Sequence, residues 1–94
     1  MEHNYQKFND TAELLKTLAH PVRICIVSGL LKKGECNVSY MQNCLAAPQS
    51  TISQHIQKLK AAGIIEGRRQ GLEIYYRVTD ERVAALMETL LSDK

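Results

Sequence analysis

The stretch PQSTISQHIQKLKAAG, residues 48–63, decides the fold, because it predicts one helix with two unlike faces. Ile52, Ile56 and Leu59 recur at helical spacing and predict a buried stripe. Pro48 is typical of a helix start and Gly63 of a helix stop. The outward positions carry uncharged hydrogen-bonding side chains followed by one cation: Gln49, Ser50, Thr51, Ser53, Gln54, His55 and Lys58.

A helix face of this composition suits the reading of DNA base edges. Gln pairs with adenine edges, Ser and Thr are permissive, and a Thr methyl can contact a thymine methyl. Backbone N–H groups behind Pro48 are free to bind a phosphate. The alternative is an ordinary solvated face, but such faces are rich in Glu and Lys, and none precedes Lys58 here. We therefore interpret residues 48–63 as a recognition helix.

Three helices are predicted upstream of it. Residues 11–19 carry a leucine stripe behind a polar capping pair, and the His-Pro step that follows ends that helix. Residues 21–33 form the second helix, which a glycine stops. A short third helix starts at Asn37 or Ser39 and reaches Leu45. Together with the recognition helix, the short helix and its turn predict a helix-turn-helix unit.

A hairpin and a last helix are predicted downstream. Two strand-like segments flank a tip between Gly67 and Gly71, and the tip carries the second candidate DNA contact: Arg68, Arg69 and Gln70. Guanidinium groups on a short hairpin suit phosphates or a narrow minor groove. Asp80 caps the last helix. The fold class is α+β, mostly α, in the order α-α-α-α-β-β-α of a winged helix-turn-helix.

Length and charge limit the alternatives. The 94 residues, 45% of them hydrophobic, make one domain, 1–94, with a net charge of +2. The positive charge is concentrated in residues 48–70, which carry four basic and one acidic side chain. The longest strongly apolar run, residues 24–31, is too short to span a bilayer, and no secretory signal opens the chain. Three unpaired cysteines favour a reducing cytoplasm, and no cofactor motif is present.

The first and last helices carry more apolar surface than one small core absorbs. Residues 80–92 are predicted to be a dimerisation helix, and residues 1–8 an N-terminal arm or an extension of the first helix. Pairing these helices across a two-fold axis buries both stripes and predicts a homodimer. The expected interface residues are Leu14, Leu18, Val83, Leu86, Met87 and Leu90.

Three segments carry a family resemblance: LLKTLAHPVRICIV, QSTISQHIQKLKAAGII and GRRQGLEIYYRV, at residues 14–27, 49–65 and 67–78. In order and spacing they resemble the ArsR/SmtB family of winged-helix repressors, over nearly the whole chain. The resemblance implies a homodimer, joined by its first and last helices, that binds double-stranded DNA at a palindromic operator and regulates transcription.

The metal sites of that family are not matched. Where arsenic and cadmium sensors of the family carry C-V-C, residues 37–39 read Asn-Val-Ser, without sulfur. Where zinc sensors place acid and histidine ligands on the last helix, Asp80 matches the first acid but Arg82 stands at a histidine position. No metal site is expected at either place.

The three cysteines could form a thiol-based switch. The alternative is that each is a small hydrophobic side chain that packs in the protein. Cys25 is expected to be partly accessible, Cys36 to lie where a helix N-terminus lowers its pKa, and Cys44 at the end of the third helix. About 12 Å of helix separates Cys25 from Cys36, too far for a disulfide unless the chain folds back. The persulfide sensors of the family use a thiol in the second helix, where this chain has Ser28, and another in the last helix, which has no cysteine.

Several functions remain as alternatives to the inducible regulator. A winged helix can act as a protein-interaction module, and a regulator can respond only to its own level. A cysteine-dependent enzyme is the third class, but no nucleophile motif, phosphate loop or H-E-x-x-H sequence supports it, and the prediction is that the protein is not an enzyme.

Overall fold

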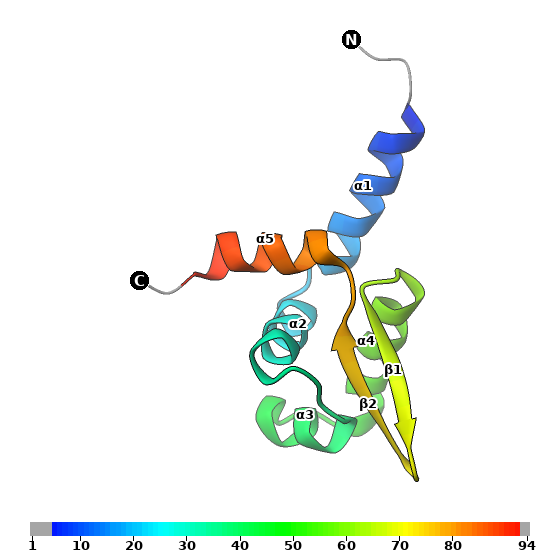
Figure 1. Cartoon of the computed structure of the whole chain (residues 1–94), viewed down its shortest axis with the longest axis vertical. Helices are drawn as coiled ribbons and strands as arrows, with labels where there is room; N and C mark the ends of the chain where they lie inside the picture. Colours follow the sequence, from blue (N-terminus) through cyan, green and yellow to red (C-terminus); the bar gives the residue numbers. More distant parts are fainter. Residues whose placement is uncertain (1–4, 93–94) are drawn as a thin grey trace.

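The computed structural model describes residues 5–92 and shows a winged helix-turn-helix with two projecting helices (Figure 1). The elements follow the predicted order: α1 Tyr5–Leu18, α2 Pro21–Lys33, α3 Val38–Leu45, α4 Gln49–Ala61, β1 Ile65–Gln70, β2 Glu73–Val78 and α5 Glu81–Leu91. The helices α2, α3 and α4 and the hairpin form the body. The helices α1 and α5 extend beyond it in different directions (Figure 1).

Side-chain caps explain where the helices begin. The Nδ1 atom of His20 accepts the backbone N–H of Val22 at 3.2 Å and caps α2. Asn37 caps α3, and the Asp80 carboxylate caps α5 by accepting two backbone N–H groups. Gly63, with φ of 75°, follows the end of α4. These boundaries confirm the predicted α2, α3, α4 and α5.

The first helix begins earlier than the sequence predicted. It starts at Tyr5 rather than Thr11, so Asp10, one of the two predicted caps, lies inside the helix, where its carboxylate accepts the side-chain amide of Gln6 at 2.9 Å, one turn away. Residues 5–8 are therefore an extension of the first helix, and residues 1–4 of the predicted arm lie outside the described part of the chain. Between Tyr5 and Ser92, no single helix is long and apolar enough to cross a membrane; α1 and α2 pass that test only together, across a 90° bend.

The hairpin is tighter than expected. Strands β1 and β2 are antiparallel and pair from Ile65 with Val78 to Gln70 with Glu73, so the turn is Gly71-Leu72. Gly71 has φ of 65°, which glycine adopts at little cost. The prediction that Arg68, Arg69 and Gln70 form the tip is therefore wrong: all three lie in β1.

A close approach inside the hairpin requires a second glycine. A Cβ atom at Gly67 would lie 2.8 Å from a methyl carbon of Ile74 and 3.0 Å from the ring of Tyr76. Since Tyr76 is buried and pairs opposite Gly67, the missing side chain lets the two strands and the body pack together.

The core lies where α2, α3, α4 and the base of the hairpin meet. Its fully buried members include Val27, Ile52 and Leu59, the last two on the stripe predicted for residues 48–63. Three residues expected at a dimer interface, Leu18, Val83 and Met87, also belong to this core. The prediction that these three residues lie at the interface is therefore wrong, because the body of the same chain buries the inner ends of α1 and α5.

Candidate nucleic-acid interface

The exposed face of α4 carries a stripe of uncharged polar side chains. Ser50 and Gln54 are exposed at a spacing of one turn, as predicted. Gln57 continues the same stripe three residues later and is also exposed. We call these three residues the polar stripe. Sequence reasoning missed Gln57, although its spacing of seven from Ser50 was the signal that could have found it.

The start of α4 borders the wing. Gln49 is exposed and lines a hollow of about 190 Å³ between the starts of α3 and α4 and the hairpin, with Leu72 and Glu73 on the opposite side. Thr51 and Ser53 are half-buried on the two flanks of the helix. Gln49, Thr51 and Ser53 lie within the first two turns of α4, at the end of the helix that borders the wing.

His55 does not project from α4 as expected. Its Nδ1 atom accepts the Nε–H of Arg23 on α2 at 3.1 Å, and its ring centroid lies 4.5 Å from that of His20. Arg23 also donates to the carbonyl of Thr17 at 3.0 Å. Burial, then the nearby His20 and Arg23, lowers the pKa of His55 below its usual 6.5. The neutral ring therefore ties the recognition helix to α2.

Lys58 lies far from the first turns of α4. It is exposed, and it borders a hollow of about 470 Å³ between α4, α1 and the start of α5, to which Asp10 and Glu13 also contribute. Nine residues of helix separate it from Gln49, about 13 Å along the axis. The charged side chains that share this hollow with Lys58 are Asp10, Glu13 and Arg82.

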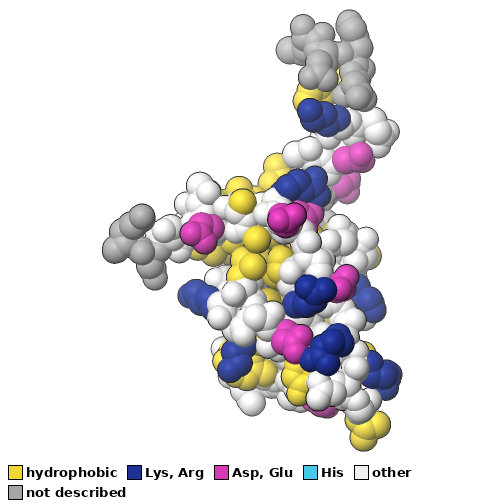
Figure 2. All heavy atoms as spheres, in the orientation of Figure 1, with side chains coloured by type: hydrophobic (Ala, Val, Ile, Leu, Met, Phe, Trp, Pro, Cys, Tyr) yellow, Lys and Arg dark blue, Asp and Glu magenta, His cyan; other side chains and the backbone are white. Residues whose placement is uncertain are grey.

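The two wing arginines differ in their partners. Arg68 forms an ion pair with Glu35, donates to the side chain of Gln70 at 2.9 Å and lies 5.5 Å from the ring of Tyr75. Arg69 makes one long contact, 3.4 Å, with the carbonyl of Gly71. Arg68 is thus held against the body, whereas Arg69 is available to an outside anion. Figure 2 shows Lys and Arg side chains gathered over the hairpin.

The wing is fastened to the start of the helix-turn-helix unit. The backbone N–H of Cys36 donates to the carbonyl of Tyr76 at 3.1 Å, and the N–H of Tyr76 donates back at 2.8 Å. The side-chain amide of Asn37 also donates to the carboxylate of Glu73 at 2.7 Å. These contacts join the wing to the residues just before α3, and α3 leads into α4. They therefore help to fix the position of the wing relative to the recognition helix.

The positions that correspond to family metal sites have structural roles. Asn37 accepts the backbone N–H of Tyr40 at 2.9 Å and caps α3, besides binding Glu73. The Asp80 carboxylate pairs with Arg82 at 2.7 Å, which lowers the pKa of Asp80. Within residues 5–92, no three His, Cys, Asp or Glu side chains group as ligands for a metal ion.

The cysteines differ from expectation in one respect. Cys25 and Cys44 are exposed, and Cys36 is buried. Burial raises the pKa of Cys36, and the opposing charge of Lys33 does not reverse the effect. The expectation that a helix N-terminus activates Cys36 is therefore wrong. All three thiols border one groove between α2 and α3, because the chain folds back at Gly34.

The outer ends of α1 and α5 expose large apolar side chains. Leu90 is 66% exposed, and Tyr5, Phe8, Leu15 and Leu91 are also exposed. Figure 2 shows apolar atoms gathered where α5 meets α1. Of the six expected interface residues, Leu90 is exposed and Leu14 and Leu86 are half-buried, the other three lying in the core.

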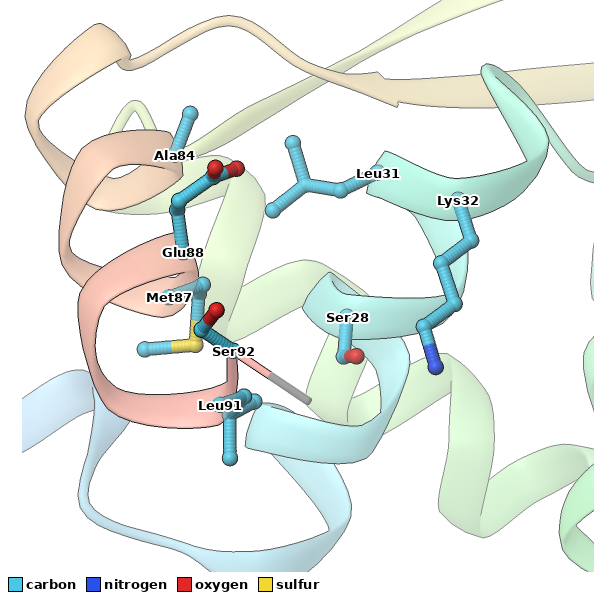
Figure 3. A pocket seen from close by; sticks show the side chains of 8 residues that line it. All are labelled: Ser28, Leu31, Lys32, Ala84, Met87, Glu88, Leu91 and Ser92. Atoms are coloured by element: carbon cyan, nitrogen blue, oxygen red, sulfur yellow. The ribbon is translucent and has the colours of Figure 1, made fainter. Parts of the chain in front are cut away.

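A groove of about 350 Å³ adjoins this apolar surface (Figure 3). One wall comes from α2, with Ser28, Leu31 and Lys32, and the other from α5, with Met87 and Leu91 among its residues. Leu31 and Leu91 are both exposed. The apolar surface of α5 therefore continues across the groove onto α2.

Comparisons with known proteins agree with this architecture. A family model described as a helix-turn-helix domain matches residues 18–68. The transcriptional repressor PagR of Bacillus anthracis is 43% identical over 86 residues, which are 92% of this chain and 86% of PagR. The crystal structure of PagR has a TM-score of 0.84 and covers 93% of this chain and 99% of its own, at 42% identity.

Two further relatives place the chain within a family. The transcriptional repressor SmtB of Mycobacterium tuberculosis is 44% identical over 75 residues, 80% of this chain and 55% of SmtB. The Mb0332 domain of Mycobacterium bovis, solved as a homodimeric winged helix-turn-helix DNA-binding domain, has a TM-score of 0.81 at 30% identity and covers 97% of this chain and 84% of its own. The chain belongs to the ArsR/SmtB family of DNA-binding winged-helix transcriptional repressors, and within it resembles PagR.

Proposed function

We propose that two copies of this protein bind one palindromic operator, with the recognition helices in successive major grooves and the wings beside them. The observation that carries the proposal is the polar stripe of α4, Ser50, Gln54 and Gln57, exposed next to a hairpin that bears Arg69. Uncharged amides and hydroxyls discriminate base edges, whereas charged side chains mainly bind phosphates. The protein acts by binding DNA in the cytoplasm, without a catalytic step.

The residues divide into three roles in this proposal. Gln54 and Gln57 read base edges, Ser50 and Thr51 support them near the helix start, and Gln49 reaches the edge of the groove next to the wing. Arg69 binds a phosphate or the minor groove. Arg68 and Gln70 shape the wing, and His55 positions α4 through Arg23; Lys58 supplies long-range attraction only.

The dimer joins the surfaces that the single chain leaves apolar. Leu90, Leu91 and Leu15 extend from the core along α5 and α1, and the groove of Figure 3 gives the partner's side chains a place to pack. An exposed apolar surface of this kind marks an association site in a soluble protein. The Mb0332 domain, solved as a homodimer, supports a dimer. Two-fold symmetry then places the two α4 helices about 34 to 36 Å apart, or a multiple of that distance.

Selection of bound sequences from a random DNA pool tests the proposal. The expected product is an imperfect palindrome whose half-sites are about one helical turn apart, bound by two copies of the chain. A winged helix that binds protein instead would select no sequence, and its DNA affinity would lack a steep salt dependence. Either result would contradict the proposed function.

A further inference from the structure

A narrow groove between α2 and α3 collects three thiols. Cys25 comes from α2, Cys36 from the link between the helices, and Cys44 from the last turn of α3. Leu30, Met41 and Leu45 are among the apolar side chains that complete its walls. We call this site the thiol groove; its volume is about 90 Å³.

The thiols of the groove differ in their access to solvent. Cys25 and Cys44 are exposed, whereas Cys36 is 5% exposed and forms part of the core. Burial raises the pKa of Cys36, and the neighbouring Cys44 adds to the rise. Since the thiolate is the nucleophile, Cys36 is the unreactive floor of the groove, and Cys25 and Cys44 are its two accessible nucleophiles.

The walls of the groove define the size and polarity of what it can accept. A closed apolar cavity of about 150 Å³ holds a benzene ring, so a smaller groove with an open side accommodates one such ring in part. A Cβ atom added at Gly29, which lines the groove, would meet nothing within 4 Å. Tyr40, also in the lining, presents a half-exposed ring with the ammonium group of Lys33 at 5.1 Å. Every residue that lines the groove is uncharged, and this lining favours a small, uncharged molecule such as a single flat ring.

We propose that the thiol groove captures a small uncharged quinone by covalent addition to Cys25 or Cys44. The thiolate sulfur forms a bond to a ring carbon, and the carbon–carbon π bond of the quinone breaks. The displaced electron pair moves to a carbonyl oxygen, which takes up the proton that the thiol lost. The hydrogen on the attacked carbon then moves to the second oxygen. The product is a hydroquinone thioether that contains every atom of both reactants, so the step needs no further oxidant and releases nothing.

An adduct in this groove would change the affinity for DNA by moving α3; this effect on DNA binding rests on the proposed function. Cys44 lies on the helix that leads into α4, and the backbone of Cys36 exchanges two hydrogen bonds with Tyr76 of the wing. A ring held between α2 and α3 therefore displaces α3 relative to α2, and with it the shared frame of α4 and the wing. We expect the affinity for operator DNA to fall by about tenfold.

The reaction is tested with 1,4-benzoquinone and intact-mass measurement followed by peptide mapping. At one equivalent, the folded protein should gain one adduct on Cys25 or Cys44 and none on Cys36. For each reagent, the rate of reaction with the protein is divided by the rate of reaction with glutathione. This ratio should be higher for benzoquinone than for the charged reagent iodoacetate. The matched control is Gly29→Leu, which keeps every thiol and adds a bulky side chain at a position that lines the groove, and it should slow the quinone reaction at both cysteines. An adduct on Cys36 first, or an unchanged rate in Gly29→Leu, would overturn the proposed site.

Operator affinity is then measured before and after quinone treatment, in the wild type and in a Cys25→Ser/Cys44→Ser variant. The treated wild type should lose affinity and the treated variant should not. An adduct on the wild type that leaves the affinity unchanged would overturn the coupling to α3. Failure of the untreated protein to bind DNA would count against the proposed function instead, since adduct formation is measured without DNA.

Discussion

The body of the molecule and its projecting helices leave different kinds of surface exposed. In the body, the buried stripe of α4 is complete and its exposed face is polar. On α5, Leu90 lies three residues after Met87 and seven after Val83, on the same stripe, yet it is 66% exposed while those two are buried. The stripe of α5 therefore continues past the end of the core. The polar face of α4 is stable in contact with water and suits DNA. The apolar end of α5 requires a second protein surface to cover it.

The largest expected effect comes from a charge at the end of α5. Leu90→Glu should yield a folded monomer, or an unfolded chain if folding requires the dimer, because a carboxylate is costly to bury in an apolar interface. Losing the second half-site should reduce operator affinity by about 10²- to 10⁴-fold. Light scattering and circular dichroism measure assembly and folding.

The matched control for that change is Ala85→Glu, at an exposed position on the opposite face of α5. This variant should remain dimeric and bind DNA normally. A dimer with intact operator affinity in Leu90→Glu would show that the apolar end of α5 is not the interface, and the comparison between the two regions would fail.

A smaller effect is expected at the boundary between the two regions, where Asp80 caps α5. Asp80→Ala removes the acceptor of two backbone N–H groups and should reduce the free energy of unfolding by about 1 kcal/mol. The same carboxylate has a lowered pKa, so its stabilising contribution is present above its ordinary pKa of 3.8 and is lost as the pH falls through the folded-state value. Urea unfolding at neutral pH measures the difference, and an unchanged midpoint would show that the cap contributes nothing.

The two wing arginines are expected to contribute unequally to DNA binding. Arg69→Ala should weaken binding to all sequences and reduce the salt slope by about one phosphate contact. Arg68→Ala should change the slope less, because Glu35 already pairs with Arg68. Affinities measured over a range of salt concentrations distinguish the two variants. Equal slopes for both would mean that the ion pair with Glu35 opens when DNA binds.

The smallest effect concerns His55. Below pH 6.5 the unfolded chain takes up a proton at His55 that the folded chain resists, since the folded pKa is lowered. The free energy of unfolding should therefore fall as the pH drops through 6.5 and stop falling below the folded pKa. Protonation also removes the acceptor for Arg23. His55→Gln should flatten this pH dependence in thermal melts; an identical dependence would place its origin elsewhere.

Local signals predicted most of this fold, and distant contacts explain what they missed. The ends of α4, the Asp80 cap and the presence of a hairpin depend on residues a few positions apart, so their sequence patterns were sufficient, although the position of the turn was not predicted. The ion pair of Arg68 with Glu35 and the hydrogen bond of Arg23 to His55 join residues 33 and 32 positions apart. No local pattern shows that such partners meet. His55 was predicted on the exposed face, although it lies three residues after Ile52 and four before Leu59, the spacings that make it a neighbour of the buried stripe.

The composition of α4 was enough to predict where the candidate site lies, but the packing in the structure was needed to assign its residues. The uncharged face of α4 identified the recognition helix, and Gln57 completes the polar stripe that Ser50 and Gln54 begin. The interface residues were harder to assign, because periodicity gives the side of a helix but not where the neighbouring core ends. Leu18 and Leu90 share the apolar character of their helices, yet only Leu90 is left outside the core.

The central claim, that the polar stripe reads bases, is tested most directly by Gln54→Ala on matched DNA duplexes. Affinity is measured for the selected operator and for a random duplex of equal length at one salt concentration. The variant should lose about 1 to 3 kcal/mol of binding free energy on the operator and almost none on the random duplex. Equal losses on the two duplexes, or no loss on either, would contradict base reading by α4.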